Sequence, residues 1–143
     1  MNRPPCAAVL LAVLATAGCR RTPPQFESRP TFPVEGTVLI QGQPTEGVQV
    51  FLHPCDASQR GQPRGVTDAA GRFRLRTYHD GDGAPAGEYT VTVYWPAPYK
   101  PQVPVEDQLP PDRLGGRFMN PKDASLRATV NAGPTTLPPF DLK

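Results

Sequence analysis

Two segments of the chain, residues 72–76 and residues 87–95, alternate between apolar and polar side chains. A period of two with one apolar side is typical of a β-strand that buries one face against a core. The side chains expected to be buried are Phe73, Leu75, Tyr89, Val91 and Val93, and those expected to face solvent are Arg72, Arg74, Arg76, Glu88, Thr90 and Thr92. These two segments predict antiparallel β-structure.

Five further segments carry the same pattern in a shorter form, at residues 34–40, 47–53, 64–67, 124–130 and 135–142. We expect the first two to form a hairpin through the turn at residues 41–44, where Gly42 is free to adopt positive φ. Asp68 and Gly71 suit a type I turn with a bulge, which would reverse the chain into residues 72–78.

Proline is unusually frequent, with 20 residues in a chain of 143. Six of the prolines lie in residues 96–116, which predicts a long excursion outside the sheets because proline cannot donate to a β-ladder. Within and just after it, residues 112–120 are expected to form one or two helical turns. The outward apolar side chains of Leu39, Phe51 and Tyr94 lead us to expect that this excursion covers their face.

About seven short strands separated by turns are typical of a β-sandwich. Pro138 and Pro139 restrict the last of these segments to an edge strand at best. We therefore predict an all-β fold, a seven-stranded antiparallel Greek-key β-sandwich, in one domain over residues 34–143.

The first 18 residues have the organisation of a secretory signal. A positively charged start precedes an apolar run of about 11 residues, which is shorter than the roughly 20 residues that a membrane-spanning helix needs. Small residues before Cys19 resemble the lipobox of bacterial lipoproteins, although Thr16 stands where leucine is commonest. The alternative is an ordinary signal peptide cleaved after Ala15 or Ala17.

The lipobox resemblance implies a signal peptide at residues 1–18, a lipid on Cys19 and a proline-rich tether at residues 19–33. The implied location is the bacterial cell envelope, with the domain facing the periplasm or the exterior and held to a membrane by acyl chains. Cys6 would leave with the signal, so Cys55 is the one other cysteine and no internal disulfide is expected. We expect Cys55 to be a small, partly buried side chain.

The charge of the chain is nearly balanced, with 15 basic and 13 acidic residues. This balance argues against a nucleic-acid-binding protein, which needs a basic stripe. Arg72, Arg74 and Arg76 form the one basic row, and we interpret them as a solvated strand face rather than a polyanion site.

The segment 67–73 together with 87–93 resembles the carboxypeptidase regulatory-like, or transthyretin-like (prealbumin-like), β-sandwich domain. Residues 34–38 and 47–50 fit the first hairpin of that family, and the tail from Arg117 looks like that of small planctomycete-type lipoproteins that carry it. The resemblance implies an accessory domain without catalytic residues. A related branch hydrolyses 5-hydroxyisourate and ends in Tyr-Arg-Gly-Ser, whereas this chain ends in Phe-Asp-Leu-Lys.

Candidate reactive residues are sparse. The segment 79–83 brings together a histidine and two aspartates but lacks the later ligands of a calcium loop, so we interpret it as a solvated hairpin loop. His53, Cys55 and His79 lack the spacing of a zinc site. The serines Ser28, Ser58 and Ser125 lie in no nucleophile motif. We therefore expect no metal, no cofactor and no catalytic residue.

The first functional interpretation is a non-enzymatic, lipid-anchored envelope protein, a structural or protein-contact module with an envelope protein as partner. The alternative is a lipoprotein that binds a small ligand or carbohydrate, with Tyr94, Trp95 and Tyr99 as a stacking surface. Aromatic side chains near a strand end more often pack at the rim of the fold. A hydrolase is the third interpretation.

Overall fold

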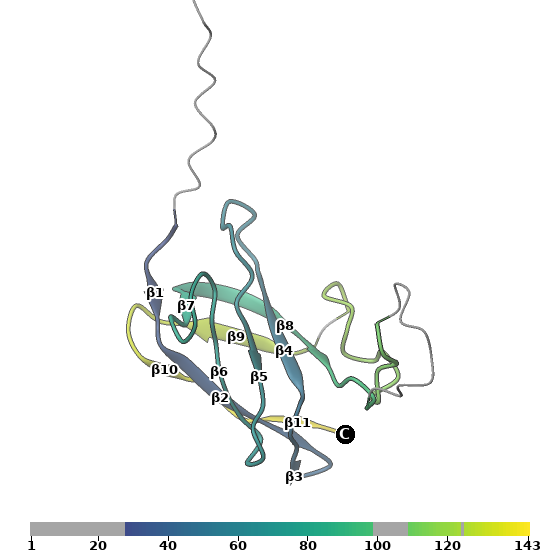
Figure 1. The fold of residues 1–143 in the computed structure, drawn as a ribbon. Coiled ribbons are helices and arrows are strands. Elements are labelled where there is room, and N and C mark those ends of the chain that lie inside the picture. Colours follow the sequence, from purple (N-terminus) through teal and green to yellow (C-terminus); the bar gives the residue numbers. More distant parts are fainter. Residues whose placement is uncertain (1–27, 99–108, 124) are drawn as a thin grey trace, which may run out of the picture.

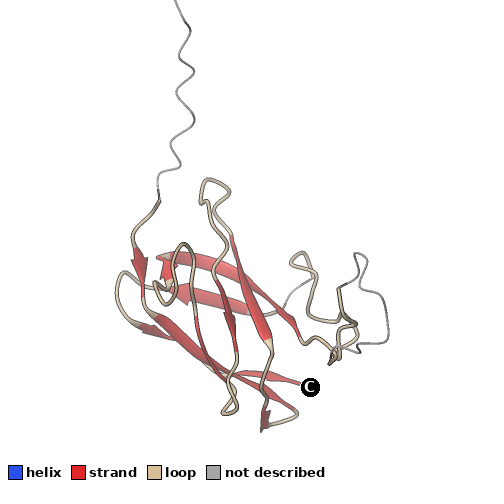
Figure 2. Cartoon of the chain, viewed as in Figure 1, coloured by secondary structure: helices blue, strands red, loops and turns tan. Residues whose placement is uncertain are grey.

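The computed structural model describes residues 28–98, 109–123 and 125–143, and these residues form two larger β-sheets packed face to face and one small two-stranded sheet (Figure 1). No helix occurs among the described residues, and Figure 2 shows strands joined by loops and turns throughout. The predicted all-β sandwich is therefore confirmed. The structure divides the chain into eleven strands, several of two or three residues, where the sequence pattern predicted seven.

The first sheet has the strand order β5–β4–β8–β9 and is antiparallel throughout. Its members are β4 (Gln49–Pro54), β5 (Arg64–Val66), β8 (Gly87–Tyr94) and β9 (Arg127–Val130). The longest strand, β8, is the one whose alternation is clearest in the sequence. It pairs along six residues with β4, from Gln49 opposite Tyr94 to Pro54 opposite Tyr89.

The second sheet is built on β2 (Val34–Ile40). The short β3 (Gln43–Pro44) and β6 (Arg72–Arg74) pair with it antiparallel, whereas β10 (Thr135–Thr136) and β11 (Phe140–Leu142) pair with it in parallel. The sandwich is thus not purely antiparallel. The final segment reaches β2 in two pieces because Pro138 and Pro139, which cannot donate, separate them.

The core consists of the facing apolar side chains of the two sheets. The first sheet contributes Val50, Leu52, Tyr89, Val91, Val93, Ala128 and Val130, and the second contributes Val34, Val38, Phe73, Phe140 and Leu142. Leu75, Val48 and Leu137, next to the strands, and Ala84 also belong to it. The rings of Phe73 and Phe140 are stacked, with centroids 6.4 Å apart and an interplanar angle of 11°. The side chains predicted from the alternation to be buried are all buried.

The expected hairpin between residues 34–40 and 47–53 is wrong. Strand β2 pairs with β3 just after the turn, but β4 belongs to the other sheet and pairs with β5 and β8. The chain therefore crosses between the sheets after β3. Both segments have an apolar face directed at the same core, so the alternation alone fits either arrangement.

Strand β8 is buried on both faces, although Thr90 and Thr92 were predicted to face solvent. The Thr92 hydroxyl lies 2.8 Å from Nε2 of His53, and Arg127 donates a hydrogen bond to the Thr90 hydroxyl. The expected helical turns at residues 112–120 are also absent. A run of turns replaces them, and Gly115 and Gly116 have positive φ, which interrupts a right-handed helix.

The turn after β5 forms as predicted. The Asp68 carboxylate accepts hydrogen bonds from the backbone N–H groups of Ala70 and Arg72, both at 2.9 Å. Gly71 has a φ of 71° and lies against the backbone of β2 and of the end of β3, so that a side chain there would be both strained and crowded. This turn carries the chain from the first sheet, in β5, to the second sheet, in β6.

Candidate functional site

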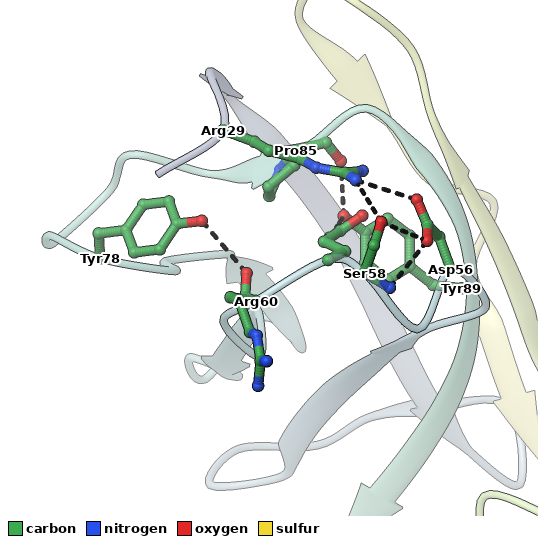
Figure 3. Close-up of polar contacts among 8 residues, drawn as sticks. Arg29, Asp56, Ser58, Arg60, Tyr78, Pro85 and Tyr89 are labelled. Atoms are coloured by element: carbon green, nitrogen blue, oxygen red, sulfur yellow. Dashed lines mark hydrogen bonds and ion pairs between the residues drawn. The ribbon is translucent and has the colours of Figure 1, made fainter. Parts of the chain in front are cut away.

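The chain enters the domain through a polar clamp centred on Arg29 (Figure 3). One guanidinium nitrogen of Arg29 donates to Oδ2 of Asp56 at 3.0 Å and to the Ser58 hydroxyl at 2.8 Å. The Ser58 N–H and hydroxyl both donate to Oδ1 of Asp56. These bonds from Ser58, together with Arg29, lower the pKa of Asp56 to about 2. Directly afterwards, β1 (Thr31–Phe32) pairs with β7 (Ala84–Pro85).

A buried hydrogen-bonded chain lies beside this clamp. The Tyr89 hydroxyl donates to the carbonyl of Pro85 at 2.6 Å and accepts a hydrogen bond from the side-chain amide of Gln59. Burial raises the pKa of the Tyr89 hydroxyl. The clamp and this chain together join the entry segment, the loop after β4 and the start of β8.

An arginine-lined edge runs along β5 and β6, where the two sheets meet. The alternation predicted a basic row of Arg72, Arg74 and Arg76, and the structure adds Arg64, which forms an isolated bridge with Arg76. Two grooves flank this edge, with volumes of about 640 and 450 Å³. Val66 and Arg74 line both of them.

The proposed stacking residues do not form one exposed surface. Tyr94 is 7% exposed, and its hydroxyl donates to the carbonyl of Pro110. The guanidinium of Arg113 lies over the ring of Trp95, 3.5 Å from the centroid, and Asp112 accepts a hydrogen bond from the Trp95 N–H. Tyr99 lies outside the described residues. The returning excursion therefore covers Tyr94, and Trp95 packs beneath Arg113. The prediction of one covered face shared by Leu39, Phe51 and Tyr94 is wrong, because Leu39 lies on β2 in the second sheet.

The reactive side chains considered above are distributed over structural roles. His53 bonds to Thr92 and lies 3.1 Å from the Gln62 amide, and burial lowers the pKa of His53. Cys55 is exposed, which corrects the expectation of a partly buried thiol, because it lies just past the last residue of β4. Among the described residues no three metal-ligating side chains come together.

The loop at residues 79–83 is closed by its own carboxylate. Asp82 accepts hydrogen bonds from the backbone N–H groups of Thr77, Tyr78 and His79 at 2.7 to 3.0 Å. Burial alone would raise the pKa of Asp82, but these three donors lower it. This carboxylate therefore orders an exposed loop. The interpretation as a hairpin loop is wrong, because β6 before the loop pairs with β2, whereas β7 and β8 after it pair with other strands.

Sequence reasoning missed the clamp, because nothing in the pattern around Arg29 pairs it with a loop 27 residues away. The predicted lipid site Cys19 and the signal and most of the tether lie outside the described residues. Within the described part of the chain, no helix is long and apolar enough to cross a membrane.

Comparisons with known proteins add little to this picture. No protein-family model matches the chain, and no curated protein matches it either. A solved structure of the major plantain pollen allergen Pla l 1 is similar over 78% of this chain and 91% of the allergen chain, with 19% sequence identity and a TM-score of 0.37.

Proposed function

We propose that this protein is a non-enzymatic, lipid-anchored contact module of the bacterial cell envelope. In this proposal residues 1–18 are a lipoprotein signal peptide, Cys19 carries the lipid, and residues 34–143 form a β-sandwich of the carboxypeptidase regulatory-like, transthyretin-like kind. Of the predicted tether at residues 19–33, only the part before Arg29 spans the distance to the domain, because Arg29 and β1 are bonded to it. Its partner would be a protein of the envelope.

The observation that supports this proposal best is the bonding of the entry segment. Arg29 and β1 fasten the chain to the domain, so only nine residues, 20–28, separate the predicted lipid site from the clamp. At no more than about 3.6 Å per residue, that spacer reaches at most about 32 Å. A lipid on Cys19 would therefore keep the domain close to the membrane surface.

The clamp also gives the domain two distinct ends. The entry segment pairs with β7, which directly precedes β8, whereas residues 109–123 lie at the far end of β8 (Figure 1). Eight residues of strand separate these ends by roughly 26 Å. The surfaces along the sandwich and at the far end are then the ones available to a partner.

The proposal is tested by measuring the acylation of Cys19 and the membrane association of the protein. We expect the wild-type chain to fractionate with membranes, with an acylated Cys19 as its first residue by mass spectrometry. The Cys19→Ser variant should be unacylated and released from the membrane fraction. Cys6→Ser is the matched control, and it should behave like the wild type. An unmodified mature N-terminus on the wild-type protein would contradict the proposal.

Ligand binding near Trp95 is a second candidate. It is favoured by a groove of about 460 Å³ that Trp95 lines together with Arg113, Arg117 and Leu142. A small acidic ligand or an acidic carbohydrate would suit this groove, because its wall carries two guanidinium groups. Binding on a glycan array that Trp95→Ala abolishes would favour this function over the contact module.

A further inference from the structure

The two arms of the β5–β6 connection are joined by backbone hydrogen bonds at both ends, and no β-ladder forms between them. Near the turn, the Asp68 N–H donates to the Arg72 carbonyl at 2.8 Å. Four residues further from the turn, Arg64 and Arg76 exchange backbone hydrogen bonds at 2.9 Å in both directions. Continuing the register places Val66 opposite Arg74, but the structure pairs β5 with β4 and β6 with β2 only.

A change of sheet explains this open step. Strand β5 belongs to the first sheet and β6 to the second, so the two arms cross instead of lying flat beside one another. Gly65 marks the crossing, because a Cβ atom built on it would lie 2.7 Å from the Arg74 carbonyl oxygen. The same crossing leaves room on both sides of the step, where the two grooves lie.

The surface around the open step is basic. Arg64, Arg72, Arg74 and Arg76 line one groove or the other. Arg76 is paired with Asp80 at 2.7 Å, and Arg74 has only a 3.9 Å contact with Glu35 between two well-exposed side chains. Arg64 and Arg72 form no ion pair with any carboxylate among the described residues. Exposed arginines without a close carboxylate are available to an external acidic group.

Apolar side chains lie between these arginines. Val66 is 59% exposed at the open step, and Phe51 on the neighbouring strand is half-buried and lines the smaller groove. The basic row is also interrupted by the carboxylates of Glu35 and Asp68 in the larger groove. These two carboxylates would repel a uniformly anionic polymer. A peptide with alternating acidic and apolar side chains could place its carboxylates at the arginines and its apolar side chains at Val66.

We propose that the β5–β6 edge is a docking site for an extended acidic peptide segment of a partner protein. The peptide lies along the edge, its carboxylates face Arg64, Arg72 and Arg74, its apolar side chains cover Val66 and Phe51, and its backbone bonds at the open Val66–Arg74 step. Extended peptides commonly bind in this way at strand edges, where main-chain bonds supply affinity and side chains supply specificity. This proposal rests on the proposed function as a protein-contact module, and it specifies the surface of the domain and the chemistry of the partner.

The test uses the full chain with Cys19→Ser, so that its outcome does not depend on acylation. The probe is a fluorescein-labelled octapeptide of alternating Asp and Val, followed by fluorescence anisotropy at low salt. We expect saturable binding that weakens as salt is added, and no binding of the matching Lys/Val peptide. Absence of saturable binding of the Asp/Val peptide would overturn the docking site. It would not affect the acylation of Cys19, which is tested separately.

Two sets of variants locate the site. Arg64→Gln with Arg74→Gln should weaken binding of the Asp/Val peptide about tenfold, and Val66→Asp should abolish it by repulsion. Arg60→Gln with Lys122→Gln removes the same charge from exposed positions outside both grooves and should leave the affinity unchanged. Equal weakening by both double variants, or tighter binding of anionic vesicles or heparin than of the peptide, would overturn the proposal.

A structural readout separates edge binding from loose charge attraction. Hydrogen exchange at the amides of Val66 and Arg74 should slow when the peptide is bound, while exchange in β9 stays unchanged. Unchanged exchange at both amides in a saturated complex would overturn the strand-edge mode.

Discussion

The ring of Phe73 lies directly over Gly36, its cross-strand neighbour in the second sheet. A Cβ atom built on Gly36 would lie 2.5 Å from Cζ of Phe73, so the absence of a side chain at residue 36 is what lets the ring lie flat there. The ring in turn stacks on Phe140, which belongs to β11. One glycine therefore sets the position of the aromatic pair that joins β6 to the C-terminal strand.

The first prediction is that Gly36→Ala destabilises the domain by about 1–3 kcal/mol, because the added methyl group must displace a packed ring. Denaturant unfolding followed by circular dichroism measures the change. Gly133→Ala is the matched control, since a Cβ atom there meets nothing within 4 Å and the backbone has no positive φ. It should be neutral or slightly stabilising. Equal stability of the two variants would contradict the packing described for Phe73.

The second prediction is that the contribution of Asp56 to folding stability is lost at low pH. Bonds from Ser58 and Arg29 lower the folded-state pKa of Asp56 to about 2, below its ordinary value. A lowered pKa stabilises the folded state above the ordinary value, and this contribution is lost as the pH falls through about 2. Asp56→Asn should therefore have a lower Tm than the wild type at pH 7, and the difference should shrink between about pH 4 and pH 2.

The location of that effect is measured by hydrogen exchange. The amides of β1 should exchange faster in Asp56→Asn at pH 7, because the clamp that precedes this strand is weakened. Arg29→Gln should give the same increase, and combining the two substitutions should add little. Additive effects would show that Arg29 and Asp56 act independently.

The third prediction concerns the buried hydroxyl of Tyr89. Tyr89→Phe leaves the Gln59 amide and the Pro85 carbonyl without their shared partner and should cost about 1–3 kcal/mol. Burial raises the pKa of this hydroxyl, so its contribution is present below about pH 10 and is lost as the pH rises further. Wild-type stability should fall in that range more steeply than that of Tyr89→Phe. Tyr78→Phe, at an exposed tyrosine, is the control and should follow the wild type.

The local pattern of this chain predicts its strands better than their partners. Alternation identified the buried side of β6 and β8 because each inward residue, such as Phe73 or Val91, is followed by a polar one. It could not decide which sheet β4 joins, since Val50 would be buried against the same core in either. Alternation also could not predict the parallel pairing of β11 with β2, because Pro138 and Pro139 indicated only an edge strand.

For the candidate sites, too, the sequence predicts which residues lie on a strand but not what they contact. The row of arginines on β6 is visible in the sequence, but the contribution of Arg64 depends on how β5 and β6 cross. Thr92 and Tyr94 were predicted to face outward, and both do, yet neighbouring side chains and the returning chain cover them. Burial of an outward residue depends on what lies over the sheet, which alternation within one strand does not record.

The pairing of β11 with β2 has a consequence for how the domain folds. Phe140 lies opposite Val38, and Leu142 opposite Ile40, about one hundred residues earlier in the chain. Contacts between such distant residues form slowly, since a long loop must close before they are made. A growing polypeptide would hold β2 without its β11 partner until residues 140–142 had been added. Completion of the second sheet therefore waits for residues far from β2 in the chain, however early β2 itself is made.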